Sequence, residues 1–147
     1  MCRWILGVGS FTRHSKLWCN ENKNGTTVFI EDIPKWAKLA REQMSCRIVM
    51  VKYETQRKDW ESLIDHPEKL TLELPDDIKN KKFDVIVVDA PEGYLPEKAG
   101  RMKSIYMSSL LSTKGSVVFV DDFKRPVENA YAKKYLTPIY GPPKLFA

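Results

Sequence analysis

The sequence predicts a single α/β domain over residues 1–147, with a mainly parallel sheet flanked by helices. Short apolar runs alternate with segments of helical periodicity, which is the pattern of strands joined by crossover helices. The apolar runs carry almost no charge, as expected of strands buried on both faces of a parallel sheet. A length of 147 residues is enough for one hydrophobic core and too short for two.

In the first half of the chain, apolar runs predict strands and the segments between them predict helices. Pro34 stands where a helix can begin, and apolar residues at helical spacing follow it. Residues 67–82 are polar and interrupted by prolines, so we expect mostly loop there. In chain order, the predicted elements are strand 4–9, helix 15–19, strand 26–30, a helix from Pro34, strand 47–51 and helix 56–65.

The second half shows the same alternation more clearly. Residues 83–89 and 115–120 are continuous apolar runs that lead into aspartates, and we expect both to be buried strands. Helical spacing over 100–111 predicts a helix between them, and Pro126 opens another helix. The proline-containing tail, 138–147, leaves room for an edge strand.

The composition indicates a globular protein with a basic surface. No run of about 18 apolar residues is present, so we expect no membrane span. The net charge of +5 favours anionic partners such as an acidic polysaccharide, although scattered lysines are also typical of an ordinary solvated surface. No Arg/Lys-rich run is interleaved with aromatic residues, so we expect no nucleic-acid partner.

The cysteines and the N-terminal segment bear on the cellular compartment. Residues 1–7 lack the apolar stretch and the cleavage site of a signal peptide. Cys2, Cys19 and Cys46 are odd in number, far apart and free of any Cys-x-x-Cys pair. We therefore expect neither a disulfide framework nor a zinc site, which is compatible with a reducing compartment.

Acidic residues close at least three of the predicted strands. Functional sites in parallel α/β sheets lie at the carboxyl ends of the strands, so these positions are candidates for a site. Ordinary solvation of loop starts is the alternative for any single one. The strand endings are Gly7-Val8-Gly9, Glu31-Asp32, Tyr53-Glu54, Asp89-Ala90-Pro91 and Asp121-Asp122.

The first two strand endings favour an adenosyl ligand. Gly7 and Gly9 allow the backbone to approach a ligand, but Thr12 replaces the third glycine of a Gly-x-Gly-x-x-Gly motif, which disfavours a dinucleotide. Glu31 lies about 22 residues further on, where a carboxylate can accept hydrogen bonds from both ribose hydroxyls. A ribose carboxylate without a phosphate loop suits S-adenosylmethionine, whose sulfonium is favoured near carboxylates. Alternatively, Glu31 or Asp32 caps the following helix; we assign Glu31 to the ribose and Asp32 to the cap.

Several blocks of sequence form a more specific pattern. The first is Asp89-Ala90-Pro91-Glu92-Gly93-Tyr94, followed by Gly100-Arg101-Met102-Lys103-Ser104-Ile105-Tyr106. The others are Val28-Phe29-Ile30-Glu31-Asp32, Val118-Phe119-Val120-Asp121-Asp122 and Arg125-Pro126-Val127-Glu128. Over residues 28–136 this pattern resembles the glucuronoxylan glucuronic acid 4-O-methyltransferase family of polysaccharide biosynthesis.

The resemblance implies a Rossmann-like class I methyltransferase fold with S-adenosylmethionine as methyl donor. The implied acceptor is the 4-hydroxyl of a glucuronic acid on a polysaccharide or oligosaccharide such as glucuronoxylan. A divalent metal ion (Mg, Mn or Co) is a further candidate cofactor in that family. Plant members of the family imply the Golgi lumen, whereas the absence of a leader in this chain would otherwise place it in the cytoplasm.

Methyl transfer to a sugar hydroxyl needs a group that removes the hydroxyl proton, and this assigns roles to the acidic residues. Asp89 is the first candidate for the base or for a metal ligand, and Asp121 and Asp122 would complete an oxygen-rich metal site. Each aspartate could instead cap a turn. The candidate catalytic residues are Asp89, Asp122 and Arg101, and the candidate donor-binding residues are Gly7, Gly9, Ser10, Glu31, Asp32, Asp89 and Ala90.

The acceptor would be bound mainly by basic and aromatic groups. Arg101 can pair bidentately with the acceptor carboxylate, and Arg125 is the second candidate, with a surface ion pair as its alternative. Tyr94 can stack on a sugar ring or on adenine, or simply anchor its loop. Two further hypotheses stay open: an O-methyltransferase for a small molecule, and a Rossmann-like binding protein without catalysis. The sequence predicts no oligomeric state.

Overall fold

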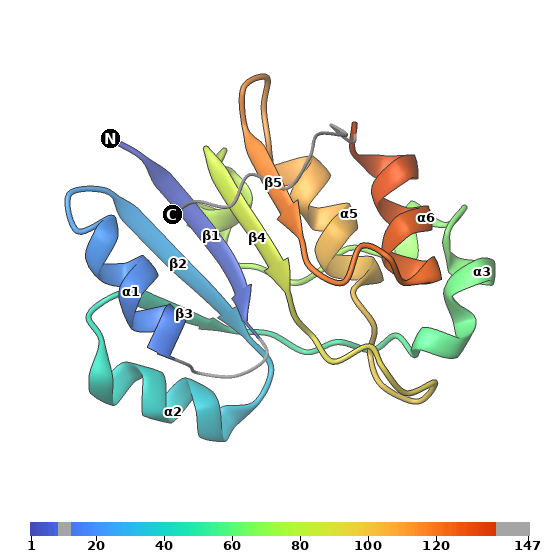
Figure 1. The fold of residues 1–147 in the computed structure, drawn as a ribbon, viewed down its shortest axis with the longest axis horizontal. Helices are drawn as coiled ribbons and strands as arrows, with labels where there is room; N and C mark the ends of the chain where they lie inside the picture. Colours follow the sequence, from blue (N-terminus) through green and yellow to red (C-terminus); the bar gives the residue numbers. More distant parts are fainter. Residues whose placement is uncertain (9–12, 138–147) are drawn as a thin grey trace.

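A five-stranded parallel sheet forms the centre of the fold, in the order β3-β2-β1-β4-β5 (Figure 1). The computed structural model describes residues 1–8 and 13–137. Every neighbouring pair of strands in the sheet is parallel, so the predicted α/β class is confirmed. The strands are β1 (Arg3–Val8), β2 (Thr26–Glu31), β3 (Arg47–Met50), β4 (Val85–Asp89) and β5 (Val117–Val120).

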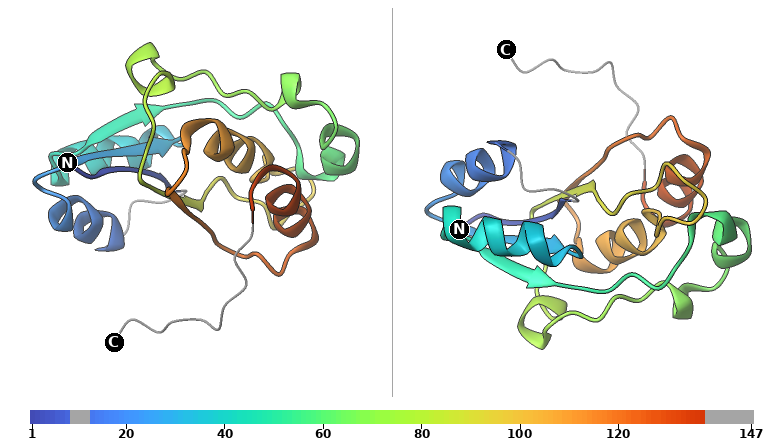
Figure 2. Two further views of the ribbon diagram at one scale, coloured as in Figure 1. Left: turned by 90° about the horizontal axis from the view of Figure 1, so that it is seen from above. Right: turned by 90° about the horizontal axis from the view of Figure 1, so that it is seen from below.

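Helices cover the two halves of the sheet differently. Figures 1 and 2 show α1 and α2 beside the β1–β3 half and α5 and α6 beside the β4–β5 half. The predicted helix at 56–65 is divided into a 3-10 turn and the short α3, and the predicted loop at 67–82 contains η2 and α4. The helices are α1 (Arg13–Glu21), α2 (Pro34–Gln43), η1 (Arg57–Asp59), α3 (Trp60–Leu63), η2 (Pro67–Lys69), α4 (Asp76–Lys79), α5 (Met102–Leu111) and α6 (Pro126–Tyr135).

Two hydrophobic cores lie on opposite faces of the sheet. Side chains alternate along β2, so that Val28 belongs to the larger core beneath α5 and α6 and Phe29 belongs to the smaller core beneath α1 and α2. Both side chains are fully buried. Strand β2 is therefore buried on both faces.

The prediction that residues 115–120 form a buried strand is wrong for one face of β5. Val118 and Val120 pack against the larger core, whereas Val117 and Phe119 point to the other face and are exposed. The physical reason is position: β5 is the last strand in the order of the described sheet, beyond the half that α1 and α2 cover. The tail at 138–147, predicted to have room for an edge strand, lies outside the described residues.

Cys19 and Cys46 form a disulfide, so the expectation of no disulfide is wrong. The two residues are 27 positions apart in the sequence, but α1 and the start of β3 meet at the smaller core, which places their Cα atoms 5.9 Å apart. The spacing of Cys19 and Cys46 in the sequence does not predict that they meet. Cys2 is a free, exposed thiol. Across the described parts of the chain, no helix is long and apolar enough to cross a membrane.

Candidate functional site at the carboxyl edge of the sheet

The order of the strands changes direction at β1, which lies between β2 and β4. Gly7 of β1 is in register with Ile30 of β2 and with Val88 of β4. Glu31 and Asp89 are the next residues on those two strands, so they flank the end of β1. Their backbones are two strand spacings apart, about 10 Å. Ligands of parallel α/β sheets bind at such a switch point, and the structure brings both predicted carboxylates to it.

Gly7 lies near the end of β1, at this same edge. Gly9 and Ser10, the other predicted donor-binding residues of this segment, lie outside the described residues. Ala90 follows Asp89 and is almost completely buried.

Glu31 is a buried carboxylate held by the turn that follows it. Its side chain is 4% exposed, and Oε1 accepts hydrogen bonds from the backbone N–H groups of Asp32 and Ile33, both at 2.9 Å. Burial raises the pKa of Glu31 to about 7, although the two backbone hydrogen bonds oppose this shift. The two bonds use one carboxylate oxygen and do not involve Oε2.

Asp32 does not cap α2, so this prediction is wrong. The N-cap residue of α2 is Ile33, which makes no side-chain cap, and Pro34 follows it at the first helical turn. Proline has no N–H to be capped, and Glu31 already binds the amides that precede it. Asp32 is half-buried beside Glu31, and burial raises its pKa.

Arg101 gathers three aspartates from two strand ends. Its Nη2 lies 3.2 Å from Asp89 Oδ1, and its Nη1 lies 3.1 Å from Asp122 Oδ2 and 3.9 Å from Asp121 Oδ2. The same guanidinium donates hydrogen bonds to the backbone carbonyls of Asp89 and Asp121. The Arg101 side chain is 7% exposed. We call Arg101, Asp89, Asp121 and Asp122 the Arg101 cluster; it joins the end of β4, the start of α5 and the turn after β5.

Asp89 is the member of the Arg101 cluster whose side chain is both accessible to a ligand and raised in pKa. Its side chain is 52% exposed, so a ligand at the switch point can reach it. Partial burial and the hydrogen bond with Asp121 raise the pKa of Asp89 to about 6, while Arg101 opposes the shift. A carboxylate with a pKa near 6 is a stronger base than an ordinary aspartate and is still mostly ionised at neutral pH.

The turn after β5 supplies the other two acids. Asp122 has a φ of 55°, a left-handed conformation that aspartate tolerates better than most residues. This turn presents Asp122 Oδ2 to Arg101 and, at 2.9 Å, to Arg125 Nη1. Arg125 therefore forms the ion pair that the sequence left as its alternative role. Tyr94 is exposed on the loop between β4 and α5.

The structure adds Glu128, which the residue-by-residue analysis did not assign to the site. Glu128 is 1% exposed on α6, and neither of its carboxylate oxygens has a hydrogen-bond partner. Burial raises its pKa, and the charges of Arg101 and Arg125 oppose this shift. A Cβ added at Gly93 would lie 3.4 Å from Glu128 Oε1, so Glu128 packs under the loop that carries Tyr94. Its only signal in the sequence is its place in the Arg125–Glu128 block.

The described residues do not fit a divalent metal ion. Within 1–8 and 13–137, no group of three or more His, Cys, Asp or Glu side chains is arranged to hold one. The predicted ligands, Asp89, Asp121 and Asp122, all face the guanidinium of Arg101, which occupies the position of a cation.

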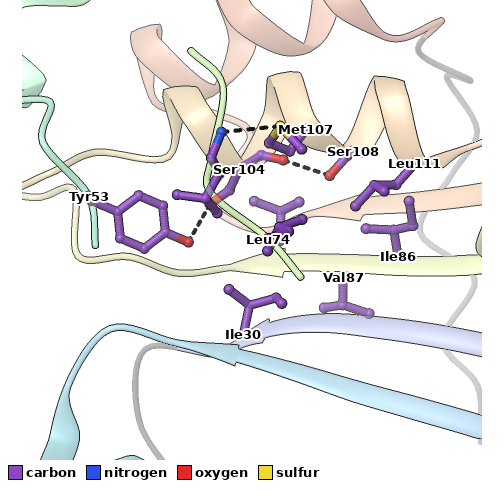
Figure 3. Close-up of a pocket in the computed structure, with 11 residues that line it drawn as sticks. Ile30, Tyr53, Leu74, Ile86, Val87, Ser104, Met107, Ser108 and Leu111 are labelled. Carbon is purple, nitrogen blue, oxygen red and sulfur yellow. Dashed lines mark hydrogen bonds between the residues drawn. The ribbon is translucent and has the colours of Figure 1, made fainter. Parts of the chain in front are cut away.

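A small cavity between the sheet and α5 is not the ligand site. It measures about 40 Å³, and Ile30, Val87 and Leu111 are among the apolar residues around it (Figure 3). Tyr53 and Ser104 share a hydrogen bond of 3.0 Å at one end of it. This volume admits water and is far too small for a nucleoside.

A parallel sheet with carboxylates on both sides of its switch point defines a Rossmann-like α/β protein. The chain belongs to the IRX15/IRX15L/GXM family, whose sequence profile matches residues 2–71 and 67–141. The family resemblance seen in the sequence is thereby confirmed.

Proteins of Arabidopsis thaliana show how the chain relates to longer sequences. It is 33% identical to Arabinogalactan O-methyltransferase 2 over 92% of this chain and 55% of that protein. It is 31% identical to Glucuronoxylan 4-O-methyltransferase 3, over 90% of this chain and 50% of that protein. It is also 31% identical to Protein IRREGULAR XYLEM 15, over 89% of this chain and 49% of that protein. The chain therefore spans about half the length of these relatives.

Proposed function

We propose that this chain is the donor-binding and catalytic part of an S-adenosylmethionine-dependent O-methyltransferase that acts on a glucuronic acid 4-hydroxyl of a polysaccharide or oligosaccharide such as glucuronoxylan. The observation that carries the proposal is the position of Glu31 and Asp89 on either side of the end of β1. The names of the relatives, which are O-methyltransferases of glucuronoxylan and arabinogalactan, support the class of reaction and of acceptor.

Glu31 is the residue proposed to bind the donor ribose. A ribose diol offers two O–H donors, and Glu31 Oε2 is not used by the hydrogen bonds that hold the turn. The negative charges of Asp32 and Asp89 near the same edge favour the positive sulfonium of S-adenosylmethionine. When bound, this cofactor supplies an electrophilic methyl group.

Asp89 is the proposed base. An oxygen of Asp89 would accept the proton of the acceptor hydroxyl as that hydroxyl takes the methyl group that the bound donor would supply. Arg101 holds Asp89 through Oδ1 and through its backbone carbonyl, which fixes the direction of the carboxylate. Asp122 and Arg101 act in this proposal as positioning residues.

Arg125 and Tyr94 are the proposed acceptor contacts close to Asp89. The guanidinium of Arg101 already faces three carboxylates, so it has little capacity left for the carboxylate of an acceptor. Arg125 has one such partner and is partly exposed, and Tyr94 offers an exposed ring. The proposed reaction uses no metal ion, because the acids predicted to bind one are paired with Arg101.

The disulfide bears on the compartment of the proposed enzyme. Disulfides such as Cys19–Cys46 form and persist in oxidising compartments and are rare in the cytosol. This favours the Golgi lumen over the cytoplasm among the two compartments that the sequence left open.

Calorimetry with S-adenosylmethionine and a methyl-transfer assay test the proposal together. We expect saturable donor binding, and transfer of labelled methyl to glucuronate-bearing xylo-oligosaccharides in preference to the same oligosaccharides with the uronate reduced. Absence of donor binding at millimolar concentration would overturn the enzyme and leave a binding protein. Equal or better transfer to small phenols would instead move the acceptor to small molecules.

A further inference from the structure

A second cleft lies beside the start of α5, separate from the switch point. It has a volume of about 590 Å³, and its walls come from residues 52–73 and from Lys103 of α5. Neither Glu31 nor Asp89 lines it. We call it the Lys103 cleft. Its size falls in the range of small-molecule sites and exceeds what one or two sugar rings need.

Lys103 is the unusual residue of this cleft. Its side chain is 7% exposed, yet among the described residues it forms no ion pair and no hydrogen bond. Lysines with so little exposed surface are normally paired, and Lys103 Nζ is not fully enclosed, so part of the ammonium is accessible from the cleft. An anion that enters the cleft would supply the missing partner.

The acidic residues of the cleft are exposed to solvent, whereas Lys103 is mostly buried. Four acids also line it, Glu54, Asp59, Glu68 and Glu73, together with Lys52 and Lys69. All six are exposed, so water screens their charges. The exposed acids can accept hydrogen bonds from hydroxyl groups and would repel a ligand with many negative charges. The combination suits a molecule with one carboxylate and several hydroxyls.

Hydrogen bonds join the wall of the Lys103 cleft to the loop between β4 and α5. Thr55 Oγ1 donates to the carbonyl of Ala99 at 3.0 Å, and the backbone N–H of Arg57 donates to the carbonyl of Lys98 at 2.7 Å. This loop connects Asp89 to Arg101, and Lys103 follows Arg101 by two residues. The wall of the cleft is therefore held by hydrogen bonds to the loop that runs from Asp89 to Arg101.

We propose that the Lys103 cleft is an acceptor subsite that binds a uronate unit of the polysaccharide, with the Lys103 ammonium paired to the uronate carboxylate and the exposed acids bound to sugar hydroxyls. This inference rests on the proposed function for the identity of the acceptor. It gives Lys103 the carboxylate of a uronate other than the unit that is methylated, whose carboxylate the proposed function leaves to Arg125.

Binding of glycans without any donor tests the subsite. The probes are a xylo-oligosaccharide with two glucuronate branches and the same oligosaccharide with both branches reduced to glucose. We expect Lys103→Met, which keeps the apolar stem and removes the charge, to weaken binding of the charged probe at least tenfold and to leave the neutral probe unchanged. Lys103→Arg should retain binding within about threefold, because it retains the charge. Lys114→Met, an exposed lysine outside the cleft, is the matched control.

A second variant tests the cleft without touching the buried lysine. Thr71 is an exposed residue of the cleft wall, and Thr71→Trp should block the charged probe by filling the space. Unchanged affinity in Lys103→Met, or in Thr71→Trp if the first variant does not fold, would overturn the subsite. Equal affinity of the wild-type protein for both probes would also overturn it.

The methyl-transfer assay separates this inference from the proposed function. Lys103-dependent binding of the charged probe by a protein that does not bind S-adenosylmethionine would support the subsite and refute the enzyme. Methyl transfer with an unchanged KM in Lys103→Met would support the enzyme and refute the subsite. If both hold, Lys103→Met should raise the KM for the acceptor and leave kcat close to wild type.

Discussion

At the scale of single residues, burial decides how the candidate site is ionised. Glu31 and Asp89 occupy equivalent positions one residue beyond the row formed by Ile30, Gly7 and Val88. Glu31 is enclosed and has a pKa near 7, whereas Asp89 is half-exposed, is paired with Arg101 and has a pKa near 6. The two acids thus titrate in the range where small changes in pH alter their charge, and each gives a prediction.

The charge of Glu31 should control donor affinity. Glu31→Gln can keep the hydrogen bonds from Asp32 and Ile33 to Oε1, but its Nε2 cannot accept a ribose hydroxyl. We expect donor binding to weaken by about 1–3 kcal/mol. In the wild type, affinity should fall as the pH drops below about 7, because the proton on Glu31 competes with the ribose. Calorimetry from pH 5.5 to 8.5 measures both effects.

Stability provides the independent readout for the same variant. The pKa of Glu31 is higher in the folded protein than in the unfolded chain, so its contribution to stability is complete below pH 4.5 and is lost as the pH rises through about 7. Glu31→Gln should therefore raise Tm at pH 8, whereas Glu42→Gln on the exposed side of α2 should change neither Tm nor affinity. Donor binding by Glu31→Gln at the wild-type level would contradict the ribose assignment.

Asp89 should set the acidic limb of the activity profile. A base must be ionised before it accepts a proton, so with saturating donor the kcat/KM for the acceptor should rise tenfold per pH unit below about 6 and level off above it. Asp89→Asn should lower kcat at least 100-fold and leave donor affinity within about twofold. Initial rates between pH 4.5 and 8 check this. Turnover that survives in Asp89→Asn would remove Asp89 from the proton transfer.

Lys103 and Arg101 show what the sequence cannot predict at this scale. The sequence identifies Arg101 as a candidate and the strand-end aspartates as a group, but pairing among them depends on the turn after β5, in which Asp122 has a positive φ. Lysine is rarely buried, so sequence reasoning treats Lys103 as a solvated residue. Lys103 is buried because α5 packs against residues 52–73. The sequence around Lys103 does not predict this tertiary contact.

At the scale of elements, the sequence predicts the positions of the strands well, because each strand contains a contiguous run of apolar residues. The pattern of β5 is as apolar as that of β4, yet β5 has an exposed face, because coverage depends on which helix lies opposite. The division of the predicted helix at 56–65 has a similar cause. The N–H groups of Arg57 and Lys58 bind carbonyls of the loop between β4 and α5 instead of continuing a helix.

The disulfide should stabilise the α1–β3 side of the fold. Closing a loop of 27 residues is worth about 3.5 kcal/mol in the chain-entropy account. We therefore expect Cys46→Ser, or reduction of the wild type, to lower the free energy of unfolding by about that amount in urea titrations. Cys2→Ser should have no such effect, since Cys2 is free and exposed. Equal stability of the oxidised and reduced wild type would show that the bond is not formed in solution.

At the scale of the whole molecule, the basic balance of charge should assist binding of acidic glycans. The net charge of +5 attracts a polyanion at long range, and salt screens such attraction over about 8–10 Å. We expect the affinity for glucuronoxylan to fall severalfold between 50 and 200 mM NaCl, while the affinity for unbranched xylan stays nearly constant. Identical salt dependence for both polymers would show that charge does not contribute to recognition.

The Arg101 cluster has one more consequence, which concerns how its energetics can be measured. A single guanidinium is shared by three acids from two strand ends, so removing one acid strengthens its interaction with the remaining two. The effects of single substitutions on the free energy of unfolding will then add up to less than the contribution of the whole Arg101 cluster. In a double-mutant cycle, Asp121→Asn and Asp122→Asn should be non-additive by about 0.5–3 kcal/mol, and tolerance of one change would say little about tolerance of two.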